Sequence, residues 1–208
     1  MSDIRETFAK RYADFLSPLA VRLEEHLVDL FRGYPRIDRI TARAKAVDSF
    51  VAKAERKDNG NLKYDDPLNQ IQDQLGARII AFYKSDAEKI AQEVPKYFRH
   101  IESRKIVPDS EKEFGYEGIH FILFVPMELY DEQQPVIEFF ELQVKTLFQH
   151  AWSEADHNLG YKPFAPLSRD QKRRLAFTAA QAWGADHVFD ELCRQTVGGS
   201  GRFSGPSD

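Results

Sequence analysis

The chain has 208 residues, a formal net charge of −4 and a hydrophobic content of 42%. These values are ordinary for a globular protein with one core, and the acidic balance excludes a general attraction for nucleic acid or anionic membranes. The single cysteine, Cys193, excludes an internal disulfide. Because a lone cysteine is typical of a reducing compartment, and the chain has neither a signal segment nor a membrane-spanning apolar run, we expect a cytoplasmic protein without membrane contact.

Hydrophobic periodicity predicts helices at both ends of the chain, with strands and helices alternating between them. Residues 4–32 predict a helix with one apolar stripe, which ends at Gly33 and Pro35. A last helix is predicted over 168–197, followed by a flexible Gly/Ser-rich tail over 198–208. Between these ends, the patterns predict strands over 37–45, 77–83, 100–107, 119–125 and 136–146, helices over 47–57, 87–97 and 147–159, and a polar loop over 58–67.

This order of elements predicts an α+β (mixed α/β) fold, in which a mixed sheet of about five strands is flanked by helices. The strand that contains His120 is apolar on both faces except at that residue, so we expect it inside the sheet. The helix over 87–97 is expected to be capped by Ser85 or Asp86. We expect residues 1–197 to form a single domain.

A group of basic residues precedes and enters the second predicted helix. Arg43 and Lys45 are two residues apart on an extended segment, so they share a side. If the helix begins near Val47, then Ser49 and Lys53 lie on one of its faces. Several positive groups and a hydroxyl around a short corner are typical of a polyphosphate site. The alternative is a solvated helix face.

Two carboxylates and their neighbours are candidates for metal chemistry. Period-two alternation places Glu141, Gln143 and Lys145 on one face of their strand, with apolar residues on the other face. Asp73 precedes another predicted strand. Two carboxylates from different segments suit Mg²⁺, with substrate phosphates completing its coordination. The alternative is a structural ion pair, for example between Asp73 and Arg78.

Two further segments carry candidate ligand contacts. Tyr116 lies between two glycines before a core strand, where its ring suits stacking on a base, although a plain loop tyrosine is the alternative. His120 is equally compatible with a ligand contact and with a core histidine. His150, Glu154 and His157 share one helix face, which zinc could use, but two histidines four residues apart, as in metallopeptidases, are absent.

These residues form five ordered blocks that resemble the synthetase domain of the RelA/SpoT family. The blocks are Arg43-x-Lys45-x-x-x-Ser49-x-x-x-Lys53, Asp73-x-x-Gly76-x-Arg78, Gly115-Tyr116-x-x-Ile119-His120, Glu141-x-Gln143-x-Lys145-Thr146 and Trp152-x-x-x-Asp156-His157-x-x-x-Tyr161-Lys162. The resemblance covers residues 37–162, and the short chain is similar to a small alarmone synthetase. It implies a nucleotidyltransferase-like fold.

The resemblance also implies an activity and a set of site residues. The family transfers the β,γ-pyrophosphate of ATP to the 3′-hydroxyl of GDP or GTP, which releases AMP and makes the alarmones ppGpp and pppGpp. It implies that Asp73 and Glu141 hold Mg²⁺, and that Glu141 accepts the proton of the attacking hydroxyl. The residues implied for ATP binding are Arg43, Lys45, Ser49, Lys53 and Arg78. The residues implied for acceptor binding are Tyr116, His120, Gln143, Lys145, His150, Asp156 and His157.

Departures from the family pattern all fall on the acceptor side. Glu117 and Gly118 replace the usual polar residues of the glycine loop, Lys145 stands where Arg is usual, and Asp156 replaces Glu. They leave open a toxic relative that uses adenine nucleotides, making (p)ppApp, or the tRNA 3′ end, with an antitoxin as partner. A catalytically silent nucleotide-binding module is a third hypothesis. The terminal helices imply a homo-oligomer, and packing of the last helix against the first within one chain is the alternative.

Overall fold

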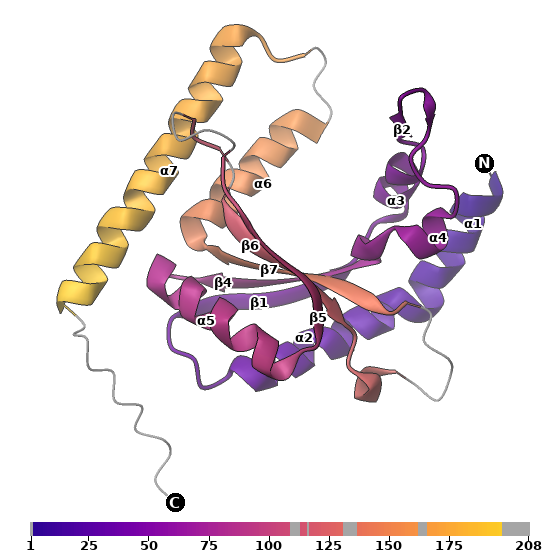
Figure 1. The fold of residues 1–208 in the computed structure, drawn as a ribbon, viewed down its shortest axis with the longest axis horizontal. Coiled ribbons are helices and arrows are strands. Elements are labelled where there is room, and N and C mark those ends of the chain that lie inside the picture. The colour runs from indigo at the N-terminus through magenta and orange to yellow at the C-terminus, as the bar shows by residue number, and fades with distance from the viewer. Residues whose placement is uncertain (1, 109–112, 116, 131–136, 162–165, 197–208) are drawn as a thin grey trace, which may run out of the picture.

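The structure is a computed structural model that describes residues 2–108, 113–115, 117–130, 137–161 and 166–196 (Figure 1). Its main sheet contains β1 (Ile37–Ala44), β4 (Leu75–Ala81), β5 (His100–Ile106), β6 (Gly118–Phe124) and β7 (Phe139–Thr146). The strand order is β1-β4-β7-β6-β5, with β4 and β7 parallel and the other neighbours antiparallel. The predicted mixed sheet of about five strands is confirmed, and β6 lies inside it.

The helices also follow the predicted order. They are α1 (Ser2–Arg11), α2 (Ser17–Phe31), α3 (Val47–Ala54), α4 (Pro67–Gln70), α5 (Lys84–Tyr97), α6 (Leu147–Tyr161) and α7 (Arg169–Thr196). A π-helical turn, η1 (Tyr12–Leu16), joins α1 to α2, so the long first helix is confirmed. Short 3₁₀ turns are η2 (Gln72–Gln74) and η3 (Met127–Leu129). Within the described part of the chain, no helix has the length and apolar character to cross a membrane.

One face of the sheet is buried beneath α2 and α5 (Figure 1). Alternate residues of the central strands point into this core, among them Ile79 of β4 and Leu142 and Val144 of β7, all of them at most 1% exposed. Burying these aliphatic side chains stabilises the fold through the hydrophobic effect. The intervening residues of the same strands therefore point to the opposite face, which carries the polar side chains.

A small hairpin occupies part of the segment that the sequence predicted as a loop. β2 (Lys57–Asp58) pairs with β3 (Asn61–Leu62). The turn between them has positive φ at Asn59 (49°) and Gly60 (87°). Asn-Gly is the sequence signature of such two-residue turns, because both residues tolerate left-handed backbone. The loop prediction was wrong here, and the dipeptide was the signal that would have corrected it.

The predicted capping of α5 was wrong. Asp86 is 4% exposed, and its two carboxylate oxygens accept hydrogen bonds from Nε and Nη2 of Arg36, both at 2.7 Å. The backbone N–H of Ser85 instead donates to Oδ1 of Asp190 on α7, at 2.8 Å. A carboxylate at a helix N-terminus satisfies a free N–H and interacts favourably with the helix dipole. The cap is therefore supplied by a residue distant in sequence.

Helix α7 packs on α6 and α5 with an unusual division of its faces. Asp186 and Asp190 are buried, whereas Phe177, Val188 and Leu192 are exposed. An apolar stripe would place Val188 and Leu192 on the packed side of α7. Instead, hydrogen bonds that Ser85 and Thr146 donate to Asp190 and Asp186 fix the orientation of the helix. The homo-oligomer stays a prediction, and the exposed apolar residues of α7 are the surface that it would use.

Candidate active site

The polar face of the sheet aligns the predicted site residues in two neighbouring rows. Residues directly opposite each other on paired strands point to the same face. The strand registers place Arg43 opposite Gly76, and Gly76 opposite Glu141, which forms the first row. The second row consists of Arg78, Gln143 and His120. Gly76 contributes no side chain between Arg43 and Glu141.

Glu141 is fixed by two polar neighbours. Its Oε1 lies 2.8 Å from Nδ1 of His120, and its Oε2 accepts a hydrogen bond of 3.0 Å from Nε2 of Gln143. Burial acts to raise the pKa of Glu141, but the hydrogen bonds and the charge of His120 outweigh it and hold this pKa below its usual range. The carboxylate is therefore ionised at neutral pH.

Asp73 bridges two lysines in η2, just before the start of β4. Its Oδ2 lies 2.9 Å from Nζ of Lys45 and 2.9 Å from Nζ of Lys53. Burial acts to raise the pKa of Asp73, but the two ammonium groups outweigh it and lower this pKa. Its backbone, with φ −91° and ψ 34°, lies near the bridge region where many active-site residues are found. Ser49 lies one turn before Lys53 on α3, on the helix face that carries this contact.

Arg78 does not pair with Asp73, which was the structural alternative from the sequence. Its Nη1 forms an ion pair of 2.8 Å with Oε1 of Glu154 on α6. From the sequence, Glu154 was a candidate only for zinc binding. Its spacing from His150 placed both on one helix face, but only the packing of α6 on the sheet shows that Glu154 meets Arg78.

The two carboxylates fit a hard divalent cation. Asp73 and Glu141 are both ionised, and they lie close enough for the charge of Asp73 to act on the pKa of Glu141. Oδ1 of Asp73 is buried without a hydrogen-bond partner among the described residues. An orphaned carboxylate oxygen beside a second carboxylate suits Mg²⁺, which takes one or two carboxylates and completes its shell with water and phosphates.

The zinc alternative has no support in the described part of the chain. No group of three or more His, Cys, Asp or Glu side chains is placed there to hold a metal ion. Glu154 is engaged by Arg78, and His157 is exposed. A zinc site built on the α6 face is therefore not formed.

Lys145 extends the polar face toward α6. The residue is 3% exposed, and its Nζ donates a hydrogen bond of 3.3 Å to Oγ of Ser153. No sequence pattern pointed to Ser153 as a site residue. Burial, with help from the positive charges of Arg78 and Arg43, lowers the pKa of Lys145 to about 8, although Glu154 and Glu141 act in the opposite direction. The site thus holds an ammonium group that titrates close to neutral pH.

The three predicted acceptor contacts on α6, His150, Asp156 and His157, differ in burial. Nδ1 of His150 is buried without a partner among the described residues, and burial lowers the pKa of its ring. Asp156 is half-buried on the helix face of Trp152, whose indole donates to Oγ1 of Thr178 on α7. His157 is exposed. Tyr116 lies outside the described residues, so its predicted stacking stays a prediction.

The fold is a mixed sheet flanked by helices, and one face of the sheet carries carboxylates, lysines and arginines. Such a face is typical of proteins that bind phosphates and a divalent cation. Sequence comparison gives the family. The family described as "Region found in RelA / SpoT proteins" matches residues 42–164. This match covers more than half of the chain, which therefore belongs to the RelA/SpoT family. The resemblance noted from the five sequence blocks is confirmed.

Individual relatives extend the match beyond the family region. The chain is 26% identical to GTP pyrophosphokinase YjbM of Bacillus subtilis over 206 residues, which is 96% of this chain and 93% of that protein. It is 25% identical to GTP pyrophosphokinase YwaC of the same organism over 165 residues, 78% of this chain and 75% of that protein. The crystal structure of B. subtilis small alarmone synthetase 1 bound to pppGpp superposes with a TM-score of 0.71 at 24% identity, covering 90% of this chain and 98% of that one. That likeness confirms the fold.

Proposed function

We propose that this protein is a Mg²⁺-dependent pyrophosphokinase that transfers the β,γ-pyrophosphate of ATP to the 3′-hydroxyl of GDP or GTP. Membership of the RelA/SpoT family supports the proposal, as do two relatives named GTP pyrophosphokinases. The observation that carries it is the pair of ionised carboxylates, Asp73 and Glu141, beside Lys45, Lys53 and Arg78 on one face of the sheet.

The donor side supplies positive charge for the ATP phosphates. Lys45 and Lys53 converge on one oxygen of Asp73, and Arg43 lies on the neighbouring strand, opposite Gly76. Phosphoryl-transfer enzymes act mainly by positioning the phosphates and stabilising the charge that develops on their oxygens. These three cations, with Arg78, stabilise the negative charge of the triphosphate and of the departing AMP.

Asp73 and Glu141 are the residues that would hold Mg²⁺. Bound there, the ion would neutralise phosphate charge and lower the pKa of the acceptor hydroxyl. Glu141 accepts the proton of the 3′-hydroxyl, and the resulting oxygen attacks the β-phosphorus of ATP. The bond between that phosphorus and the oxygen bridging to the α-phosphorus breaks, and AMP leaves with both electrons of that bond. His120 holds the Glu141 carboxylate in place during this transfer.

The acceptor nucleotide is assigned to Gln143 and His120 of the second row of side chains, and to the residues beside them. Gln143 and His120 lie next to each other on the sheet face, and Lys145 follows on the same strand. Lys145 would bind the acceptor phosphates, while the two other side chains would orient the ribose. His150 adds a ring whose buried nitrogen has no partner among the described residues.

A product assay tests the proposal. Purified protein is incubated with Mg²⁺ and ATP alone, or with GDP, GTP or ADP added, and the products are separated by liquid chromatography and mass spectrometry. We expect AMP and a 3′-pyrophosphorylated guanosine nucleotide, and we expect a metal chelator to stop both. If only adenosine products form, the acceptor is an adenine nucleotide and not GDP or GTP. Absence of any product with all four acceptors would refute the proposed activity.

The lowered pKa of Lys145 leads us to expect that kcat/KM for the acceptor falls at alkaline pH. As pH rises through its pKa of about 8, the ammonium group loses its proton and its attraction for phosphate. We expect kcat/KM for the acceptor to fall about tenfold between about pH 7.5 and 9, because this constant reports groups of the free enzyme. The Lys145→Arg variant keeps its charge over this range, so its profile should stay flat there. Identical profiles for the two proteins would contradict the assignment.

A further inference from the structure

Thr146, the last residue of β7, begins helix α6 with a capping box. Its backbone N–H donates to Oε1 of Gln149 at 3.0 Å, and the backbone N–H of Gln149 donates to Oγ1 of Thr146 at 3.1 Å. This reciprocal pair satisfies N–H groups that the start of a helix otherwise leaves without a partner. Thr146 belongs to the fourth sequence block, but the proposed reaction gives it no part. Its contacts fix the point at which α6 leaves the sheet.

A buried carboxylate of the last helix completes this capping box. Oγ1 of Thr146 donates a hydrogen bond of 2.7 Å to Oδ2 of Asp186 on α7. Thr146 is fully buried and Asp186 is 4% exposed, so water competes little for this bond. A hydroxyl has one proton and two lone pairs. Because the carboxylate takes the proton, a lone pair of Oγ1 is left to face the N–H of Gln149.

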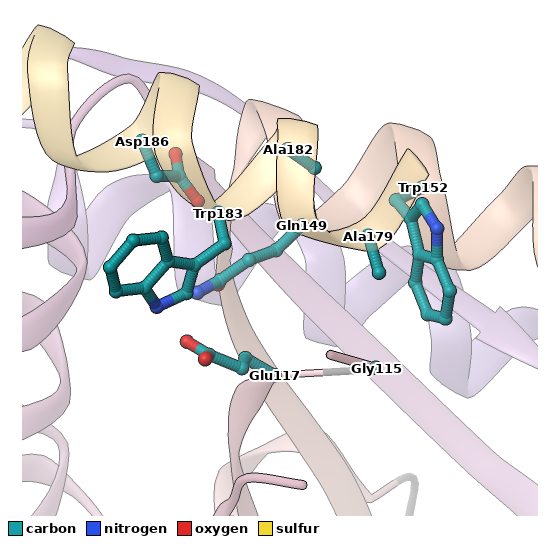
Figure 2. Close-up of a pocket in the computed structure, with 8 residues that line it drawn as sticks. All are labelled: Gly115, Glu117, Gln149, Trp152, Ala179, Ala182, Trp183 and Asp186. Carbon is teal, nitrogen blue, oxygen red and sulfur yellow. The ribbon is translucent and has the colours of Figure 1, made fainter. Parts of the chain in front are cut away.

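Helices α6 and α7 lie close together around this hydrogen bond. Figure 2 shows Asp186 of α7 and Gln149 of α6 beside a small pocket, with Glu117 across it. The pocket has a volume of about 20 Å³, which is room for about one water molecule. The carboxylate of α7 is therefore packed against the start of α6.

Helix α6 carries two side chains that contact the proposed site. Oγ of Ser153 accepts a hydrogen bond of 3.3 Å from Nζ of Lys145. Glu154 forms an ion pair of 2.8 Å with Arg78. Both α6 residues lie within about 8 Å of Gln149 along the helix axis, at a rise of about 1.5 Å per residue. A shift of the helix at its start therefore moves both contacts.

A second buried aspartate of α7 has the same role at a different helix. Asp190 is 5% exposed, and its Oδ1 accepts a hydrogen bond of 2.8 Å from the backbone N–H of Ser85 in the first turn of α5. Asp186 and Asp190 are one turn apart, so they share a face of α7. The two residues match in type, burial and helix, but they contact the starts of different helices.

We propose that Asp186 is a positioning residue, which fixes the start of α6 by holding the hydroxyl of Thr146. Through α6 it keeps in place the two side chains that contact Lys145 and Arg78. This inference rests on the proposed function, which assigns Lys145 to the acceptor phosphates and Arg78 to ATP. Asp186 acts through α6 rather than on a substrate.

Hydrogen–deuterium exchange tests the anchoring without any activity. In Asp186→Ala, a peptide covering residues 146–154 should exchange about five- to tenfold faster than in wild type, because the first turn of α6 opens more often. In Asp190→Ala, the faster exchange should appear at residues 84–90 of α5 instead. Wild-type exchange of 146–154 in Asp186→Ala, or the same pattern in both variants, would overturn the proposal.

Two other substitutions of Asp186 show whether its hydrogen bond is responsible. Asp186→Asn keeps an oxygen that can accept from Thr146, so residues 146–154 should exchange within about twofold of wild type. Asp186→Leu removes the acceptor but fills the buried position with an apolar side chain. It should accelerate exchange as Asp186→Ala does, and it carries the test if the alanine variant does not fold. Equal exchange in Asp186→Asn and Asp186→Leu would show that the hydrogen bond is not the anchor.

The pH profile tests the effect on the site. Burial is the main cause of the lowered pKa of Lys145, and α6 contributes to it through Ser153. The charged groups that also act on Lys145 are Arg78, Glu154, Glu141 and Arg43. In Asp186→Ala, the alkaline fall of kcat/KM for the acceptor should move to higher pH by about half a unit or more, because the ammonium group is less buried. Asp190→Ala should keep the wild-type profile.

The alkaline fall does not report Asp186 itself, because burial raises the pKa of that carboxyl only to about 6. An unchanged profile in an Asp186 variant whose α6 exchanges faster would refute the positioning role. If the wild-type protein makes no product, the proposed function fails, while hydrogen–deuterium exchange still decides whether Asp186 holds the start of α6.

Discussion

The Glu141→Gln substitution is expected to lower the rate of pyrophosphate transfer by about 10³-fold while leaving the protein folded. It removes the charge of a carboxylate that is ionised at neutral pH, and with it both the proposed proton acceptor and one metal ligand. The shape of the side chain is kept. Oε1 of Gln143 is buried without a partner among the described residues. If the Gln143 amide rotates, this oxygen can accept a hydrogen bond from the side-chain amide of the introduced glutamine. We therefore expect little loss of stability.

Rate and stability are measured on the same preparations. Initial rates with saturating ATP, Mg²⁺ and acceptor give the loss of activity, and thermal unfolding gives the change in melting temperature. Glu138→Gln is the matched control, because Glu138 is an exposed carboxylate just before the same strand. The control should keep wild-type activity. If Glu141→Gln retains more than about a tenth of the wild-type rate, Glu141 has neither proposed role.

The strand pattern predicted one face of the site but not its cross-strand contacts. Alternation along the sequence placed Glu141, Gln143 and Lys145 together because strands have a period of two, and the structure confirms this. The contact of Glu141 with His120 depends on the register between β6 and β7, which no local pattern specifies. Arg78 was only an example of a structural partner for Asp73, and the structure pairs this carboxylate with Lys45 and Lys53 instead.

The contributions of α7 were beyond the reach of local sequence rules. Capping rules search within a few residues of a helix start, whereas the cap on α5 comes from Asp190, over a hundred residues later. The hydrophobic pattern of α7 was also misleading, because the buried Asp186 and Asp190 stand on its packed face where apolar residues would be expected. Burial raises the pKa of one of them, Asp186, to about 6, against the opposing effect of its hydrogen bond from Thr146. Only the packing of helices on the end of β7 reveals these roles.

The Asp73→Asn substitution is expected to lower activity by about two to three orders of magnitude and to raise the Mg²⁺ concentration needed for half-maximal rate. An amide is a poor ligand for Mg²⁺, and it leaves Lys45 and Lys53 close together without the carboxylate that both contact at 2.9 Å. Losing these charge-assisted hydrogen bonds should also cost about 1–3 kcal/mol of stability. Rates measured against Mg²⁺ concentration check the first effect. Asp65→Asn is the control, because Asp65 is an exposed carboxylate eight residues earlier in the chain.

The stability effect of Asp73→Asn has a definite pH dependence. Because the folded protein lowers the pKa of Asp73, the carboxylate stabilises the fold at neutral pH, and this contribution is lost as pH falls below the usual aspartate range and through the lowered pKa. The difference in unfolding free energy between wild type and variant should therefore be full at pH 7 and shrink in acid, as measured by urea unfolding at both pH values. A difference that persists unchanged in acid would mean that the Asp73 carboxylate is not stabilised by the lysines, and the donor-side assignment would lose its electrostatic basis.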